Sequence, residues 1–152
     1  MKVSDEASQT DDAQMRASLD AMPHKVWMVR PEGPALYYNR AMRAFAGEAL
    51  NLPDRASREQ ALVHPDDLAD FRSAVARAIA DPQDFELEIR LLDPIGAWRW
   101  HRLNYSMMRK GGRVEAWLTT ATDIDDLRQA MTTAQENSDQ LRLAAEATQL
   151  GI

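Results

Sequence analysis

The side chains best suited to acid–base or ligand chemistry in this sequence are its three histidines, His24, His64 and His101. They fall on separate predicted elements and include no pair at i, i+4 spacing, so their pattern does not support a metal site. His64 opens the string HPDD at a predicted helix start, where we expect its imidazole, with Asp66 and Asp67, to bind local backbone groups. His24 is expected to be exposed, which leaves His101 as the histidine of most interest.

Other reactive residue types are absent or lack the required arrangement. The chain has no cysteine, which excludes a disulfide scaffold, a thiol nucleophile, a cysteine zinc site and cysteinyl–flavin chemistry. It also has no glycine-rich phosphate loop, no Gly-x-Ser-x-Gly motif and no paired carboxylates in an apolar setting. We therefore expect no enzyme in this segment. A small α+β enzyme that uses His101 as a base is kept as an alternative, although no partner acid is evident.

The composition is that of one globular domain with acidic ends. Of the 152 residues, 45% are hydrophobic and 28% are charged. No apolar run approaches the length of about 20 residues that a transmembrane helix needs, and the polar first residues do not form a secretory signal. The net charge of −6 is concentrated in residues 1–21 and 123–152, and no basic stripe is present. We expect a cytoplasmic protein that does not bind nucleic acid.

The leader is predicted to contain a short amphipathic helix. Thr10, followed by two aspartates, is typical of a helix start, and Met15, Leu19 and Met22 recur at helical spacing before Pro23. This apolar stripe is too small to build a core of its own. We therefore expect a homodimer with Met15, Leu19 and Met22 at its interface.

The rest of the chain alternates between strand and helix patterns. Strands are predicted over residues 25–30, 36–38, 85–91, 97–109 and 113–122, and helices over 40–46, 65–80 and from 123 to near the end. Asn39 and Gly47 are expected to begin and end the first of these helices, and residues 48–63 to form short helical turns. This order specifies an α+β fold, with an antiparallel sheet and helices gathered on one face.

Five stretches of the chain resemble the PAS domain, the small sensory module of signalling proteins such as bacterial histidine kinases. They are LDAMPHKVWMVRPEG (19–33), YNRAMRAFAG (38–47), VHPDDLADF (63–71), FELEIRLLDPIGAWRWHRL (85–103) and WLTTATDIDDL (117–127). The resemblance implies a five-stranded antiparallel sheet with helices on one face, enclosing a small cavity. It divides the chain into a leader and flanking helix (1–22), a PAS domain (23–123) and a linker helix (124–152). Residues 139–152 resemble the opening of a second PAS domain.

The cavity that the resemblance implies is the candidate ligand site. In the light-oxygen-voltage branch of the family, the position of His101 holds an asparagine that contacts flavin, which implies that His101 points inward and Trp100 outward under a flanking helix. A hydrogen-bonded core or surface histidine is the alternative. The candidate contacts are Trp27, Phe71, Val75, His101, Leu103, Tyr105, Trp117 and Thr119.

Two cofactors of related domains are not expected here. Haem-binding PAS sensors use an axial histidine within the long helix, and the matching helix of this chain contains none after its first turn. The absence of cysteine excludes covalently held flavin. We expect neither haem nor flavin, and any ligand would be a small molecule held without a covalent bond.

The exit from the domain is expected to transfer the signal. The string Thr122-Asp123-Ile124-Asp125 resembles the Asp-Ile-Thr string that joins the last strand of PAS domains to the following helix. Asp125 replaces the usual threonine and is expected to cap that helix, while Asp123 pairs with a core arginine. Ile124 is expected to pack on the sheet edge and to pass movement on to Leu127.

The exit helix carries a weak heptad pattern, formed by Leu127, Met131, Ala134, Ser138, Leu141, Ala145 and Thr148. It favours a pairing helix that shifts between states, or alternatively an amphipathic helix that covers its own sheet over 125–135. Our hypothesis is a sensory and dimerisation module that relays ligand occupancy or partner contact to a downstream PAS domain and an output domain. That output is expected to be a histidine kinase of a two-component system or, alternatively, a diguanylate cyclase. A ligand-free dimerisation and relay module is the other alternative.

Overall fold

The computed structural model describes the backbone of residues 2–33 and 35–149, and the side chains of 9–33 and 35–149. Met1, Pro34 of the predicted turn at 31–34, and residues 150–152 of the predicted second-domain opening lie outside the described residues. The elements follow in this order: α1 (Lys2–Ala21), β1 (Lys25–Val29), β2 (Ala35–Tyr38), α2 (Arg40–Ala46), the 3-10 helix η1 (Gly47–Asn51), α3 (Arg55–Leu62), α4 (Pro65–Ala80), β3 (Phe85–Leu92), β4 (Trp98–Lys110), β5 (Arg113–Asp123) and α5 (Asp125–Gln149).

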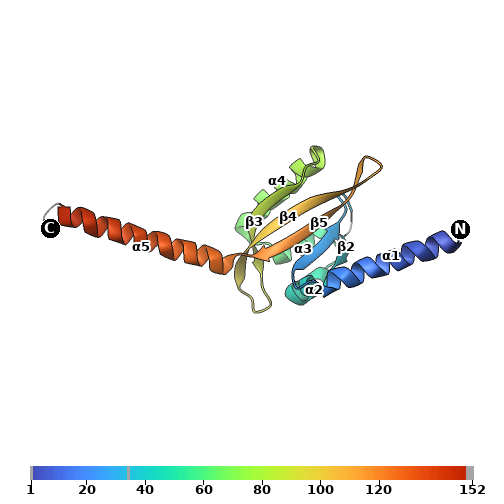
Figure 1. Ribbon diagram of the computed structural model, residues 1–152, viewed down its shortest axis with the longest axis horizontal. Coiled ribbons are helices and arrows are strands. Elements are labelled where there is room, and N and C mark those ends of the chain that lie inside the picture. The colour runs from blue at the N-terminus through green and yellow to red at the C-terminus, as the bar shows by residue number, and fades with distance from the viewer. Residues whose placement is uncertain (1, 34, 150–152) are drawn as a thin grey trace.

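The five strands form one antiparallel sheet in the order β2-β1-β5-β4-β3 (Figure 1). The long strands β4 and β5 are joined by a tight turn in which Gly111 and Gly112 have φ values of 58° and 79°, a conformation that favours glycine. Strand β1 pairs with β5, so that Trp27 lies opposite Thr119. The predicted α+β fold and five-stranded sheet are therefore confirmed.

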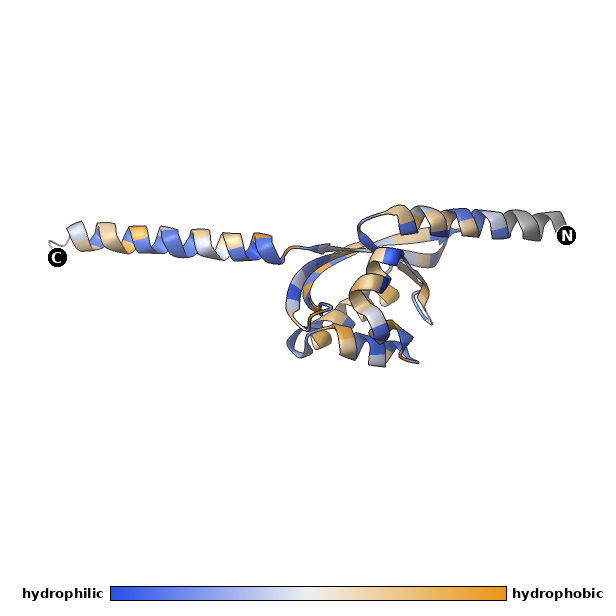
Figure 2. Ribbon diagram, turned by 90° about the horizontal axis from the view of Figure 1, so that it is seen from below, coloured by the Kyte–Doolittle hydropathy of each residue, from blue (hydrophilic) through white to orange (hydrophobic). Residues whose placement is uncertain are grey.

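The two faces of the sheet carry different partners. Helices α2, α3 and α4 lie over one face and enclose the main core, whereas α1 lies on the opposite side of the sheet (Figure 2). Near its end, α1 places Leu19 in a second small cluster with Val26, Met28 and Ala116. Because side chains alternate along a strand, β1 supplies Trp27 and Val29 to the main core, and Val26 and Met28 to the second cluster.

Several predicted caps are confirmed. The side chain of Asn39 accepts a hydrogen bond from the N–H of Met42 at 3.0 Å, and Gly47 ends α2 with a φ of 58°. His64 Nδ1 accepts the N–H of Asp66 at 3.1 Å at the start of α4. Asp67 differs from the prediction, because its carboxylate accepts bonds from the backbone and guanidinium of Arg90 on β3 rather than from local groups of α4.

The predicted start of the leader helix was wrong. Helix α1 begins at Lys2 rather than near Thr10, and it ends at Ala21. Neither glycine nor proline occurs between these two residues, so the sequence contains no strong helix breaker before Pro23. Asp11 and Asp12 are exposed in the interior of the helix, where they are tolerated because they face solvent.

Helices α1 and α5 extend from the domain in opposite directions (Figure 1). Beyond its first turn α5 leaves the sheet, so the alternative in which residues 125–135 cover the sheet was wrong. No helix within residues 2–33 and 35–149 combines the length and the apolar character needed to cross a membrane.

Candidate functional site

A cavity of about 90 Å³ lies between the sheet and the helices that cover it. Its floor is formed by inward-facing residues of β1, β3, β4 and β5, and its roof by residues of α2, α3 and α4. Six of the predicted contact residues line it: Trp27, Phe71, Val75, Leu103, Tyr105 and Trp117. Most of the remaining lining is aliphatic, including Met42 of α2 and Ile89 of β3. The structure thus brings together residues that are up to 90 positions apart in the sequence, from Trp27 to Trp117.

The cavity also has a charged rim that the sequence analysis missed. Arg55, Arg58 and Glu59, all on α3, belong to its lining and are half-buried. With Leu62 they follow i, i+3, i+4, i+7 spacing, so they share one face of the helix. This spacing is a sequence signal for a helix face, whereas residues 48–63 are predicted from the sequence only as short helical turns.

Two polar side chains in the cavity wall have no partner. The hydroxyl of Tyr105 has no hydrogen bond within the described part of the chain, and the indole Nε1 of Trp117 is likewise without an acceptor there. Burial raises the pKa of the Tyr105 phenol well above its usual range, so that this group stays protonated. Both groups are therefore available as hydrogen-bond donors.

His101 points inward, as the resemblance implied, but the expectation that it contacts the cavity was wrong. Its ring is fully buried and meets Phe45 of α2 edge to face, with ring centroids 5.1 Å apart. Nδ1 lies 2.9 Å from the carbonyl oxygen of Arg99, while Nε2 has no partner among the described residues. Burial lowers the pKa of His101, and the nearby positive charges of Lys25 and Arg99 act in the same direction. His101 is thus a neutral core histidine, covered by Phe45.

Thr119 is also absent from the cavity lining, contrary to the prediction. It is fully buried on the inner face of β5, directly opposite Trp27 on β1 and Tyr105 on β4. These two larger side chains flank it and form the cavity floor in its place. Its hydroxyl has no hydrogen-bond partner among the described residues.

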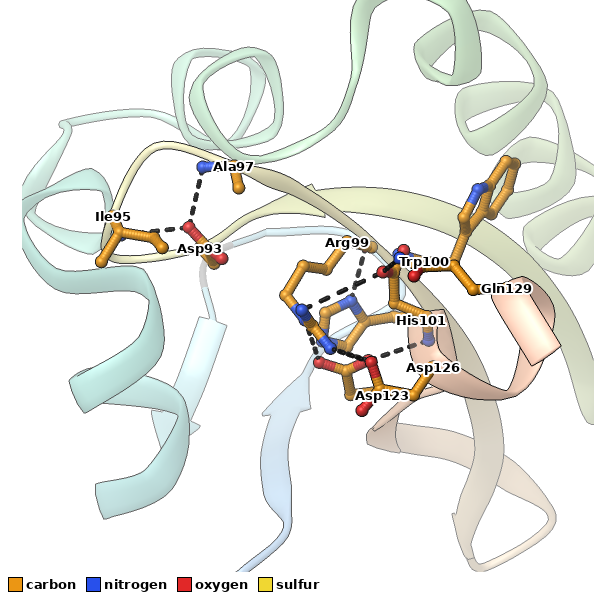
Figure 3. A network of polar contacts seen from close by, with 10 residues as sticks. Asp93, Ile95, Ala97, Arg99, Trp100, His101, Asp123, Asp126 and Gln129 are labelled. Atoms are coloured by element: carbon orange, nitrogen blue, oxygen red, sulfur yellow. Dashed lines mark hydrogen bonds and ion pairs between the residues drawn. The ribbon is translucent and has the colours of Figure 1, made fainter.

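The start of α5 is held to the sheet by a network of carboxylates and backbone groups (Figure 3). Arg99 Nε donates to Asp123 Oδ2 at 2.6 Å, which confirms the predicted pairing of Asp123 with an arginine of the sheet. Burial opposes ionisation of Asp123, but the bonds from Arg99 and from the N–H of Asp125 outweigh it, so its pKa lies below the usual value. Arg99 also pairs with Asp126 at 3.3 Å.

The predicted capping role of Asp125 was wrong. Because α5 begins at this residue, its own N–H donates to Asp123 Oδ1 at 2.9 Å. Its carboxylate instead accepts the N–H of Trp100 on β4 at 3.1 Å and the side chain of Gln129 at 2.6 Å. Ile124 is buried as predicted, and its N–H donates to the carbonyl of Trp100 at 2.8 Å. Two backbone groups of Trp100 therefore fix the entry into α5.

Trp100 faces outward beneath a side chain of α5, as the resemblance implied. The guanidinium of Arg128 lies 3.8 Å from the centre of the indole ring and also pairs with Glu88 of β3 at 3.4 Å. The apolar positions of the predicted heptad do not pack on the domain: Leu127, Met131 and Leu141 are 54%, 63% and 73% exposed. Because Leu127 is exposed, its packing does not support the expected transfer of movement from Ile124 to Leu127.

The three residues predicted for the dimer interface do not form one exposed stripe. Met15 and Met22 are 38% and 45% exposed, whereas Leu19 is buried against the outer face of the sheet. Leu19 is thus already part of the core of this chain.

Among residues 2–33 and 35–149, no group of three or more histidine, aspartate or glutamate side chains is arranged to hold a metal ion.

Comparisons with known proteins agree with this architecture. The family described as PAS fold matches residues 36–121. A sensory box histidine kinase/response regulator from Burkholderia thailandensis E264 is similar in structure, with 18% identity, a TM-score of 0.61, and coverage of 85% of this chain and 98% of that chain. The N-terminal domain of a diguanylate cyclase with PAS/PAC sensor from Marinobacter aquaeolei has 20% identity, a TM-score of 0.56, and coverage of 69% and 98%.

One curated relative that contains a similar segment is a much longer protein. The uncharacterized protein y4lL of Sinorhizobium fredii is 29% identical over 85 residues, which is 55% of this chain. The matched part is only 10% of the length of that protein.

Proposed function

Because this chain belongs to the PAS fold family of sensory modules, we propose that it converts occupancy of its cavity into a displacement of α5. The domain itself has no catalytic signature. The ligand would be a small molecule held without a covalent bond, and the signal would leave through Asp123, Ile124, Asp125 and the first turn of α5.

The observation that carries this proposal is that β4 and β5, two of the strands that form the cavity floor, also hold the start of α5. Leu103 and Tyr105 of β4 lie in the cavity floor, and Arg99 of the same strand binds Asp123. Arg99 and Leu103 lie four positions apart on β4, or about 13 Å of extended strand. A shift of β4 or β5 caused by a ligand would therefore also move the groups that fix α5.

His101 supplies a second connection between these two regions. It lies between Arg99 and Leu103 on β4, and its ring contacts Phe45 of α2 while Nδ1 bonds to the carbonyl of Arg99. Movement of α2, which contributes Met42 to the cavity, would thus reach the backbone of Arg99 through two direct contacts. Because His101 is fully buried, this arrangement gives less support to the alternative in which His101 is a catalytic base.

We further propose that the module acts as a cytoplasmic homodimer and that α5 leads to a downstream output domain. The exposed heptad residues of α5 would pair with those of a second copy, since apolar side chains at this spacing are typical of coiled coils. The output would be a histidine kinase or a diguanylate cyclase, as in the two structural relatives. The small volume of the cavity favours a second candidate function, a ligand-free dimerisation and relay module.

The coupling is testable by filling the cavity and measuring the position of α5. Since the chain has no cysteine, spin labels can be attached at Glu115→Cys on β5 and Glu136→Cys on α5, with labelled protein diluted into unlabelled protein. We expect Val75→Phe, which fills the cavity from α4, to shift the distance distribution measured by double electron–electron resonance. Ala76→Phe, at the exposed neighbouring position, is the matched control. Identical distributions in the two variants would contradict the proposed coupling.

A further inference from the structure

We propose that the cavity binds a short-chain carboxylate, with its apolar tail between α4 and the sheet and its carboxylate at Arg55 and Arg58. This inference rests on the proposed function, because it assigns a ligand class to the same cavity. It comes from the charged lining residues of α3 and from the donors in the cavity wall that have no partner among the described residues.

The rim has an excess of positive charge. Two of the three charged lining residues are arginines, and the third is Glu59. The carboxylate of Glu59 is already paired with Arg72 at 3.4 Å. Arg55 donates to the carbonyls of Pro31 and Arg30 at 3.4 Å and 3.2 Å, and Arg58 donates to the carbonyl of Leu52 at 2.9 Å. A guanidinium carries five N–H donors, so both arginines retain donors for a ligand. Carboxylates are the preferred small partners of such groups.

The wall of the cavity adds two neutral donors. Trp117 is 1% exposed, and its buried indole N–H has no partner within the described part of the chain. Tyr105 is 4% exposed, and its hydroxyl makes no hydrogen bond there. Tyr105 lines the same cavity as Arg55 and Glu59. An unpaired buried donor such as the indole N–H of Trp117 is costly, and a ligand oxygen would satisfy it. A cationic ligand offers no such acceptor and would be repelled by the arginines.

The volume limits the size of the tail. A cavity of roughly 150 Å³ accommodates benzene, with its six carbon atoms. The cavity of about 90 Å³ in this chain would by proportion hold about three or four carbon atoms. The apolar part of its lining, which includes Phe71 and Val75, matches an aliphatic tail. Butyrate, with three carbon atoms beyond its carboxylate, is therefore a suitable probe.

Calorimetric titration with butyrate, its neutral amide butyramide and n-butylammonium tests this inference on the whole chain. We expect butyrate to bind about tenfold or more tightly than butyramide, since bonds between charged groups are stronger than neutral ones, and n-butylammonium not to bind. Arg58→Gln and Arg55→Gln should each reduce the affinity for butyrate toward that for butyramide, and Arg58→Lys should restore part of it. Arg113→Gln, at an exposed arginine at the start of β5, is the matched control and should have no effect.

The outcomes separate this inference from the proposed function. If butyramide binds as tightly as butyrate, or if both glutamine variants bind butyrate like the unmodified protein, the carboxylate assignment is wrong, although the cavity remains a ligand site. If no probe binds, the carboxylate assignment is again overturned, and the spin-label distances of Val75→Phe decide separately whether the cavity is coupled to α5. Thermal unfolding of each variant identifies any loss of affinity that follows from loss of the fold.

Discussion

At the scale of single residues, Asn39 is the most fully bonded polar side chain in the domain. It is completely buried, and its carbonyl oxygen accepts the N–H groups of Val26 and Met42, both at 3.0 Å. Its amide donates to the carbonyls of Leu19 and His24, both at 2.8 Å. One side chain thus joins the end of α1, the entry into β1 and the start of α2.

Replacement of Asn39 is therefore expected to destabilise the whole domain. Asn39→Ala leaves two buried N–H groups and two carbonyls without this partner, and we expect the free energy of unfolding to fall by about 3 kcal/mol. Urea denaturation measures this loss. Asn51→Ala, which removes a single exposed bond to Glu48, is the matched control and should change stability by less than about 0.5 kcal/mol. Equal losses in the two variants would show that Asn39 has no special structural role.

Asp67 is expected to contribute to the pH dependence of stability. Its bonds from Arg90 hold its pKa below the usual value, so the folded state favours the ionised form. This stabilisation is present above the carboxyl pKa of about 4 of the unfolded chain and is lost as the pH falls through the lower pKa of the folded state.

Replacing Asp67 with asparagine should make the free energy of unfolding depend less on pH. We expect Asp67→Asn to cost about 2 kcal/mol at pH 7 and progressively less toward pH 3, because protonation removes the same interaction from the unmodified protein. Urea denaturation across this pH range provides the measurement. Asp66→Asn makes the same change in net charge at an exposed neighbour and should leave the slope unchanged. If the free energy of unfolding depends on pH with the same slope in both variants, Asp67 is not the source of this pH dependence.

At the scale of elements, the entry into α5 depends on contacts with β4 more than on the usual capping of a helix. Asp123 binds both Arg99 and the first N–H of the helix, and Trp100 holds Ile124 and Asp125 through its backbone. Within the described part of α5, the hydrogen bonds and ion pairs of the residues after Arg128 lie within the helix itself. Its direction is therefore set by a small number of polar bonds.

Loss of the Asp123 carboxylate should loosen this junction without unfolding the domain. We expect Asp123→Ala to lower stability by about 1 kcal/mol and to accelerate hydrogen exchange at the N–H groups of Asp125 and Trp100. We also expect it to change the output of the parent protein. Asp126→Ala, which removes only the more exposed partner of Arg99, is the control and should have a smaller effect. Unchanged exchange in Asp123→Ala, or output lost only together with the fold, would remove the junction from the mechanism.

At the scale of the whole molecule, the exposed apolar positions of α5 are the part of the chain most suited to pairing with a second copy. Deletion of residues 1–22 would not test the dimer, because Leu19 belongs to the core and its removal would uncover Val26, Met28 and Ala116. A test should instead leave the domain intact and alter only the projecting helix.

Charges placed on the heptad seam should prevent dimerisation. We expect Met131→Glu combined with Leu141→Glu to shift the mass measured by multi-angle light scattering from dimer to monomer, because charged side chains are costly at the core positions of a coiled coil. Thr133→Glu combined with Gln140→Glu adds the same charge on another face of α5 and should remain dimeric. A dimer that persists in the seam variant would show that the interface lies elsewhere.

Much of the fold could be predicted from local sequence patterns. Alternation in 85–91 predicted β3, the string HPDD predicted the start of α4, and Asn39 and Gly47 predicted both ends of α2. These signals act over a few residues, because capping bonds and side-chain alternation depend on near neighbours. The motif resemblance added a single five-stranded sheet and the existence of a cavity, and the inward orientation of His101 followed from it.

Only the tertiary structure decided which inward-facing residues reach the cavity and how α5 begins. His101 and Thr119 face inward like Leu103 and Tyr105, but Phe45 from α2 covers the first, and larger neighbours on adjacent strands flank the second. Arg55 and Arg58 reach the rim because α3 packs over the sheet, and Asp125 turns to Trp100 because β4 lies beside it. Each of these outcomes depends on side-chain volumes and bonds between distant segments, which alternation and capping rules do not contain.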